Sequence, residues 1–90
     1  MRTKKTLEIV ERLGQALVAR GLYMGAAESC TGGLLCDALT NVSGSSDWFL
    51  GGVVAYANSA KTSLLGVNPG DILKHGAVSE AVVRAMAGGV

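Results

Sequence analysis

The sequence contains two short apolar runs, each followed by a polar turn and then by a helical pattern. The first run covers residues 22–27 and the second covers residues 49–57. Short apolar runs bounded by glycine and polar residues are typical of buried strands. Because a helix follows each run, the chain alternates helix and strand, which favours a largely parallel sheet with right-handed connections. We therefore predict a layered αβα domain of the α/β class, a single domain over residues 1–90.

Three helices have a polar residue suited to cap their first turn. These residues are Thr6, Asn58 and Ser79. The first helix is expected to extend to about Arg20, and the second to Leu65, each followed by a glycine that stops it. The last helix is expected to place three apolar residues on one face: Val82, Val83 and Met86.

The composition is more apolar than a small monomer can easily hide. Hydrophobic residues make up 49% of the 90 residues, while two strands alone do not form a stable sheet and a parallel sheet needs both faces covered. Trp48 and Phe49 are expected in the core or in a subunit contact. We therefore expect the sheet to be incomplete in this chain, and we predict a homo-oligomer.

Several function classes are disfavoured. The net charge is +1, and the basic residues are scattered apart from Arg2, Lys4 and Lys5, which argues against a nucleic-acid partner. Cys30 and Cys36 form neither a disulfide framework nor a metal motif, so we expect no metal site. No apolar run is long enough to span a membrane, and the N-terminus lacks a signal-peptide pattern. A reduced cytoplasmic protein is expected.

The stretch from Gly44 to Lys61 carries polar groups at both ends of an apolar segment. Tyr56, Asn58 and Lys61 stand where the strand gives way to a helix, which is where open α/β sheets bind ligands. Ser45 and Ser46 stand at the other end, about 30 Å away if the strand were straight. A shared site therefore requires the chain to fold back, and we predict a break or bulge at residues 51–52.

The loop Glu28-Ser29-Cys30-Thr31-Gly32-Gly33 joins the first strand to a helix. Its hydroxyl groups and glycines at a helix N-terminus suit a phosphate-like anion. The alternative is that Thr31 only caps the helix and that Gly32 and Gly33 only allow close packing. The loop is neither a P-loop nor a dinucleotide-binding fingerprint.

A serine hydroxyl needs a base to become a nucleophile. The single histidine, His75, is expected in a turn, so Lys61 is the remaining candidate, with Tyr56 able to relay a proton or hold the lysine. Lys61 is predicted at the third position of its helix, beside the positive end of the dipole, which is unfavourable for a solvated ammonium. The alternative is a surface lysine and a packed tyrosine, and the residues alone do not choose between Ser29 and Ser46 as nucleophile.

Five segments occur in a characteristic order: AESCTGGLL, NVSGSS, GGVVAYANSAK, LLGV and GAVS. Together they resemble the C-terminal domain of the CinA (competence/damage-inducible) family, the nicotinamide-nucleotide amidohydrolases, over about residues 6–90. The resemblance implies an enzyme that converts nicotinamide mononucleotide to nicotinate mononucleotide and ammonia in pyridine-nucleotide salvage, without metal or organic cofactor. Domains of this family continue through a second glycine-rich loop that this sequence does not contain.

Carried onto this sequence, the resemblance implies Ser46 as nucleophile, Lys61 as base and Tyr56 as the third catalytic residue. It also implies a set of substrate-binding residues: Glu28, Ser29, Thr31, Gly32, Gly33, Ser45 and Asn58. Two other functions remain open. One is a non-catalytic module that binds nucleotide or assembles with another chain, and the other is a regulator linked to competence or DNA damage.

Overall fold

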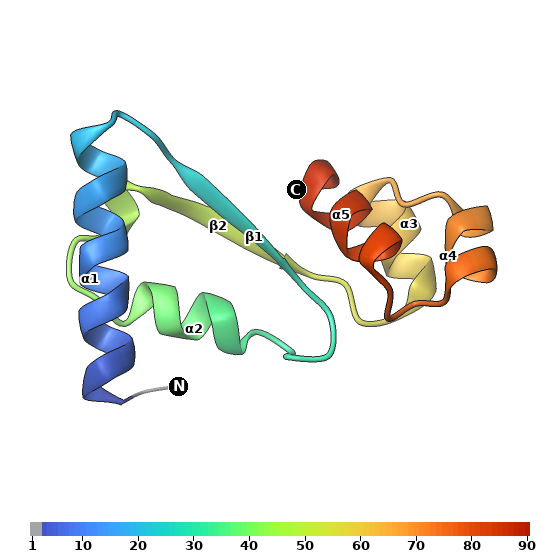
Figure 1. Ribbon diagram of the computed structural model, residues 1–90, viewed down its shortest axis with the longest axis horizontal. Coiled ribbons are helices and arrows are strands. Elements are labelled where there is room, and N and C mark those ends of the chain that lie inside the picture. Colours follow the sequence, from blue (N-terminus) through green and yellow to red (C-terminus); the bar gives the residue numbers. More distant parts are fainter. Residues whose placement is uncertain (1–2) are drawn as a thin grey trace. The chain divides into compact units, whose positions relative to one another are not determined.

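The computed structural model describes residues 3–90, and the chain divides into two compact units. The first unit comprises the chain up to Ala26 together with Gly33–Gly52, and the second comprises Ala27–Gly32 and Val53–Val90. Figure 1 labels the helices and strands of both units. The expectation of one domain over residues 1–90 stays a prediction.

The elements follow the predicted alternation of helix and strand. Their order is α1 (Lys4–Ala19), β1 (Met24–Glu28), α2 (Leu34–Thr40), the 3-10 helix η1 (Ser45–Asp47), β2 (Phe49–Val54), α3 (Asn58–Leu65), α4 (Pro69–His75) and α5 (Glu80–Gly89). The first strand begins two residues later than expected because Leu22 and Tyr23 are exposed in the turn after α1. The second strand ends three residues earlier than expected.

The two strands form a parallel pair, which confirms the predicted fold class. The Met24 amide donates to the Trp48 carbonyl at 2.8 Å, and the Ala55 amide donates to the Glu28 carbonyl at 2.8 Å. A regular parallel ladder would pair the Glu28 carbonyl with the amide of residue 54, so β2 contains one extra residue, a bulge. Gly51, with φ of 148°, lies between Trp48 and Ala55, the residues of the second strand region that form these two hydrogen bonds. The predicted bulge is present, but β2 is continuous and the chain does not reverse there.

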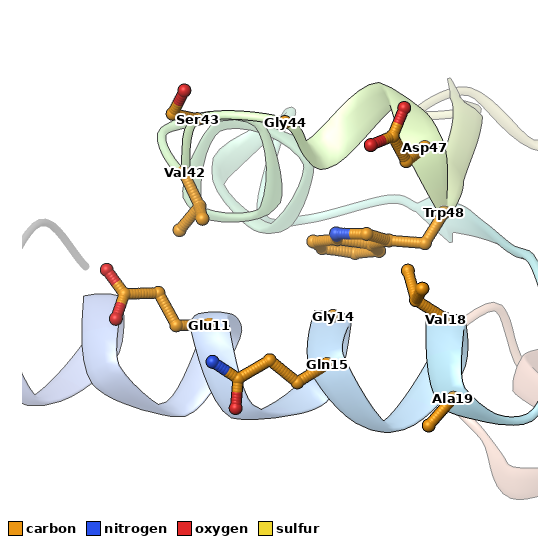
Figure 2. Close-up of a pocket in the computed structure, with 10 residues that line it drawn as sticks. All are labelled: Glu11, Gly14, Gln15, Val18, Ala19, Val42, Ser43, Gly44, Asp47 and Trp48. Carbon is orange, nitrogen blue, oxygen red and sulfur yellow. The ribbon is translucent and has the colours of Figure 1, made fainter.

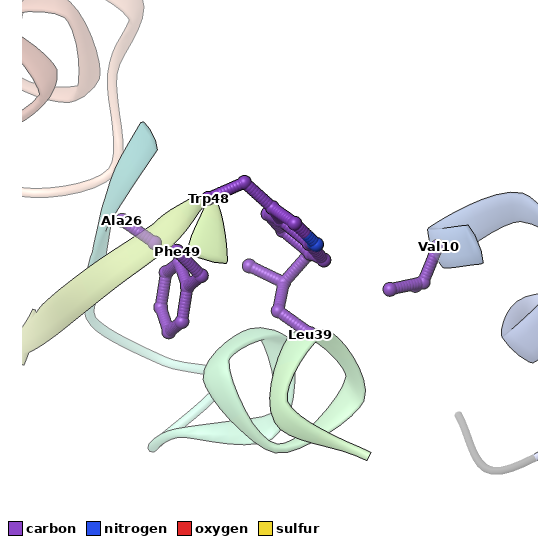
Figure 3. Packing of buried hydrophobic residues seen from close by; sticks show 5 residues of the cluster. All are labelled: Val10, Ala26, Leu39, Trp48 and Phe49. Atoms are coloured by element: carbon purple, nitrogen blue, oxygen red, sulfur yellow. The ribbon is translucent and has the colours of Figure 1, made fainter. Parts of the chain in front are cut away.

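The core of the first unit is built around Trp48 and Phe49 (Figure 3). Val10 from α1, Leu39 from α2 and Ala26 from β1 complete this cluster. Gly14 lets α1 approach the indole closely, because a side chain at that position would overlap the ring of Trp48. Trp48 and Phe49 therefore belong to the core, one of the two roles expected for them.

The second unit has a core of smaller aliphatic residues contributed by α3, α5 and the segments beside them. They are Ala55, Leu65, Val67, Val82 and Met86. Helices α3, α4 and α5 pack against one another within this unit. Gly89 of α5 lies directly on the backbone of Leu65, where a Cβ atom would overlap the carbonyl group.

Two of the three predicted caps are wrong. Thr3 caps α1, because its hydroxyl accepts from the Thr6 amide at 3.1 Å, so the helix begins one turn earlier. Ala57 precedes α3 without a side-chain cap, and Asn58 is the first helical residue. Ser79 caps α5 as predicted, accepting from the Val82 amide at 3.3 Å.

The burial of side chains near the two chain ends agrees only in part with the sequence predictions. Val82 and Met86 are buried as predicted, but Val83 is 59% exposed, so its placement on the same apolar face was wrong. Of the three clustered basic residues, Lys4 and Lys5 begin α1 and are exposed, whereas Arg2 lies outside the described residues.

Candidate active site

Lys61 is a buried lysine near the start of α3. Its side chain is 2% exposed, and its Nζ donates to the main-chain carbonyl of Tyr56 at 2.9 Å. Since Ala57 precedes the helix, Lys61 is its fourth residue and not its third as predicted. Lysine is almost never fully buried without a partner, because removing an ammonium from water costs several kcal/mol. The alternative of a surface lysine is therefore wrong.

Tyr56 holds this lysine through its backbone and not through its phenol. The tyrosine side chain is 73% exposed, and its hydroxyl forms no hydrogen bond with any residue that the structure describes. The alternative of a packed tyrosine is therefore wrong. The carbonyl partner could not be predicted, since every residue carries the same group.

The loop after β1 is organised around Glu28. This glutamate is 3% exposed, and the Thr31 hydroxyl donates to its Oε1 at 2.7 Å. The Gly32 amide donates to the Ser29 carbonyl at 3.1 Å, which closes a turn that begins at Ser29 and has Cys30 and Thr31 at its centre. Thr31 is not the cap of α2, because Gly33 occupies that position with φ of 112° and no side-chain hydrogen bond. The Gly32 amide is thus already occupied, which weakens the predicted anion site without testing it.

Ser29 directly follows the carboxyl end of β1, and Tyr56 follows that of β2 after Ala55. The hydrogen bond from the Ala55 amide to the Glu28 carbonyl joins these ends. Ser29 is half-buried, and both residues belong to the second unit together with Lys61. Carboxyl ends of parallel strands are where α/β folds bind ligands. The second unit therefore offers a serine hydroxyl, a buried lysine and a phenol from adjoining segments.

Ser45 and Ser46 belong to the first unit and precede β2. Ser45 is 9% exposed and its carbonyl accepts from the Trp48 amide at 3.1 Å, whereas Ser46 is exposed in η1. Both serines therefore lie at the amino end of β2, opposite in chain direction to the end where Tyr56 stands. The assignment of Ser46 as nucleophile stays a prediction.

Asn58 is exposed at the start of α3. No described side chain caps this helix, so the backbone N–H groups of Asn58 and Ser59 are potential donors to an anion. Asn58 and Ser59, with residues of α3 and α4, also line a pocket of about 350 Å³. This pocket does not include Ser29, Tyr56 or Lys61, so the role of Asn58 in substrate binding stays a prediction.

The described residues contain neither a metal-binding cluster nor a membrane-spanning helix. Within residues 3–90, no group of three or more His, Cys, Asp or Glu side chains could hold a metal ion. Both cysteines are free thiols, with Cys30 exposed and Cys36 half-buried. None of the helices in the described part of the chain has the length and apolar character needed to cross a bilayer.

Comparison with known proteins identifies the family. The model of the CinA C-terminal domain family matches residues 6–90. A CinA-like protein of Salinibacter ruber is 61% identical over 85 residues, which are 94% of this chain and 20% of that protein. A protein of Enterobacter agglomerans named nicotinamide-nucleotide amidohydrolase PncC is 49% identical over 90 residues, covering 100% of this chain and 55% of that protein.

Solved structures give the same result. The crystal structure of the competence/damage-inducible protein CihA from Agrobacterium tumefaciens matches with a TM-score of 0.94 and 38% identity, over 99% of this chain and 54% of that one. This chain therefore spans between a fifth and about half of the length of the relatives it matches. A family match over almost the whole sequence, together with a shared fold, shows that the chain belongs to the CinA C-terminal domain family.

Proposed function

We propose that the second unit carries part of the active site of an amidohydrolase that converts nicotinamide mononucleotide to nicotinate mononucleotide and ammonia. The substrate is suggested by the names of relatives that are 46–49% identical to this chain. The observation that carries the proposal is Lys61, buried with its Nζ on a main-chain carbonyl at 2.9 Å, in the same unit as Ser29. A lysine held in this way is suited to serve as a base.

The sequence left two serines open as nucleophile, and the arrangement of the second unit favours Ser29. Its position after β1 adjoins the segment that holds Tyr56 and Lys61, through the hydrogen bond between Ala55 and Glu28. Ser46, the residue implied by the resemblance, is retained as the competing assignment. Replacing Ser29 or Ser46 by alanine distinguishes the two assignments.

In the proposed reaction, Ser29 Oγ attacks the carbonyl carbon of the carboxamide while the Lys61 amine accepts the hydroxyl proton. The tetrahedral intermediate then expels ammonia, which takes up the proton from Lys61. Water hydrolyses the resulting serine ester with the same lysine as base. Tyr56 is the third catalytic group, and no metal or organic cofactor takes part.

Substrate binding is assigned to the segments around this centre. The uncapped start of α3 at Asn58 is suited to the phosphate, because free N–H groups and the helix dipole attract an anion. Glu28, Thr31, Gly32 and Gly33 shape the loop that presents Ser29. Ser45 belongs to the first unit, and its substrate contact stays a prediction from the sequence. The protein is expected to act in the cytoplasm.

The proposal is tested by measuring ammonia release from nicotinamide mononucleotide with this 90-residue chain. Ser29→Ala and Lys61→Met should each lower turnover by about 10²- to 10⁴-fold, the usual contribution of such groups. Lys74→Met is the matched control, since Lys74 is exposed on α4, and it should leave turnover unchanged. Full turnover by Ser29→Ala with loss in Ser46→Ala would restore Ser46 as nucleophile. No ammonia from the unaltered chain would favour the non-catalytic module.

Self-association is a further part of the proposal. Large apolar side chains remain exposed in both units, including Leu50 at 73% in the first and Leu73 and Val78 at 90% in the second. Exposed apolar side chains of this kind favour subunit contacts, and a twofold dimer is the commonest solution. Sedimentation at micromolar concentration should show a species of at least twice the monomer mass, and a compact monomer would contradict this.

A further inference from the structure

The first unit contains a groove that the proposed reaction does not use. It lies between α1 and the segment from Val42 to Trp48, and its volume is about 530 Å³ (Figure 2). Glu11, Gln15 and Val18 line one wall from α1. The groove follows α1 from Glu11 to Ala19, a rise of about 12 Å.

The floor of the groove carries a hydrogen-bond donor that no described residue satisfies. Trp48 is 4% exposed, and its Nε1 forms no hydrogen bond with any described residue. Within residues 3–90, every fully buried side-chain nitrogen has a hydrogen-bond partner. Since Trp48 Nε1 has none among these residues, it is not fully buried, and its N–H remains accessible from the groove. Figure 2 shows the indole lying between α1 and the opposite wall, above Gly14. A donor at this place requires an acceptor from a ligand or from water.

The charges around the groove have one sign. Glu11 and Asp47 line it, and neither carboxylate forms an ion pair with a described residue. No lysine or arginine is among the lining residues. An apolar floor with one N–H donor and two carboxylates that no described residue pairs is complementary to a group that is cationic, partly apolar and able to offer a carbonyl oxygen.

We propose that this groove binds a basic peptide segment of a partner protein. A main-chain carbonyl of the segment accepts from Trp48 Nε1, an arginine or lysine side chain pairs with Glu11, and an apolar side chain packs along Val18 and Val42. The length of the groove favours a peptide over a small cation, because about four extended residues span 12 Å. The proposal is independent of the amidohydrolase reaction.

The probe is the capped tetrapeptide acetyl-Ala-Arg-Leu-Ala-amide. Trp48 is the single tryptophan of the chain, so its fluorescence and its indole N–H resonance report on this groove alone. Titration should shift the indole resonance in a saturable manner. The same peptide with citrulline in place of arginine keeps the shape and loses the charge, and it should bind about fivefold more weakly, as expected for one exposed ion pair.

Two variants complete the test. Glu11→Gln should reduce the affinity for the arginine peptide to that of the citrulline peptide, whereas Glu8→Gln, a change on the same helix at a residue that does not line the groove, should have no effect. Both residues are exposed, so both variants should fold. An unshifted indole resonance at millimolar peptide, or equal affinity for the two peptides, would overturn the proposal. An indole signal that depends on protein concentration and does not respond to peptide would assign the groove to a contact between two copies, which also overturns it.

Discussion

The two units of this chain bury different kinds of side chain. The first unit packs Trp48, Phe49 and Leu39 together, and its buried polar residue is the neutral Ser45. The second unit packs smaller aliphatic residues and also buries two ionisable ones, Glu28 and Lys61. The first unit therefore follows the general rule that ionisable side chains stay out of the core, and the second unit departs from that rule.

The difference indicates where the chemistry lies. Burying a charged group costs free energy that well-packed apolar residues would not cost. A thin core of small side chains cannot easily offset that cost, so the burial of Glu28 and Lys61 is better explained by function than by stability. The first unit, in this account, supplies rigid packing, and the second supplies the reactive groups.

The largest expected effect on stability is in the first unit. Trp48→Ala should lower the free energy of unfolding by about 3–5 kcal/mol, because it removes the central aromatic ring of the cluster. Trp48→Phe retains part of that packing and should cost less. Urea denaturation followed by circular dichroism measures both. A loss below about 1 kcal/mol for Trp48→Ala would show that the first core does not depend on the indole.

A smaller effect is expected where the second unit relies on close backbone contact. Gly89→Ala should cost about 1–3 kcal/mol, because the added methyl group overlaps the Leu65 carbonyl. Gly88→Ala is the matched control. Nothing lies within 4 Å of a Cβ atom at that position, and the change should be neutral or stabilise α5 by up to about 1 kcal/mol. Thermal unfolding of the two variants measures this difference in stability. Equal unfolding midpoints would contradict the close contact between Gly89 and the Leu65 backbone.

The smallest change in the free energy of unfolding is expected for Lys61, although its replacement should abolish activity. Lys61→Met replaces the buried amine by an apolar side chain of similar length, so the removed desolvation cost offsets the lost hydrogen bond to the Tyr56 carbonyl. We expect the free energy of unfolding to change by less than about 1 kcal/mol while turnover is lost. If Lys61→Met unfolded the protein, Lys61 would be a structural residue and the contrast between the units would fail.

Much of the fold could be predicted from local signals. Alternating helix and strand, the cap at Ser79 and the glycine stop after Leu65 depend on neighbouring residues, and all are confirmed. The wrong caps have a physical reason. A threonine or asparagine can occupy the cap or the first turn, and the sequence does not say which backbone amide its hydroxyl or amide oxygen will meet.

The site was less predictable. The position of Lys61 at a helix start marked it as unusual, and its burial agrees with that. Its carbonyl partner and the bond between Thr31 and Glu28 depend on how the turns close, which residue types do not specify. Val83 shows the same limit, because helical spacing alone placed it on the buried face and packing left it exposed.

The most direct test of the central claim is to trap the covalent intermediate. The chain is mixed with nicotinamide mononucleotide, quenched in acid within the first turnovers, and digested for mass spectrometry. The account predicts an added nicotinoyl nucleotide on the peptide containing Ser29, present in Ser46→Ala and absent in Ser29→Ala. An adduct on Ser46, or ammonia release without an adduct on either serine under conditions that trap serine esters, would contradict it.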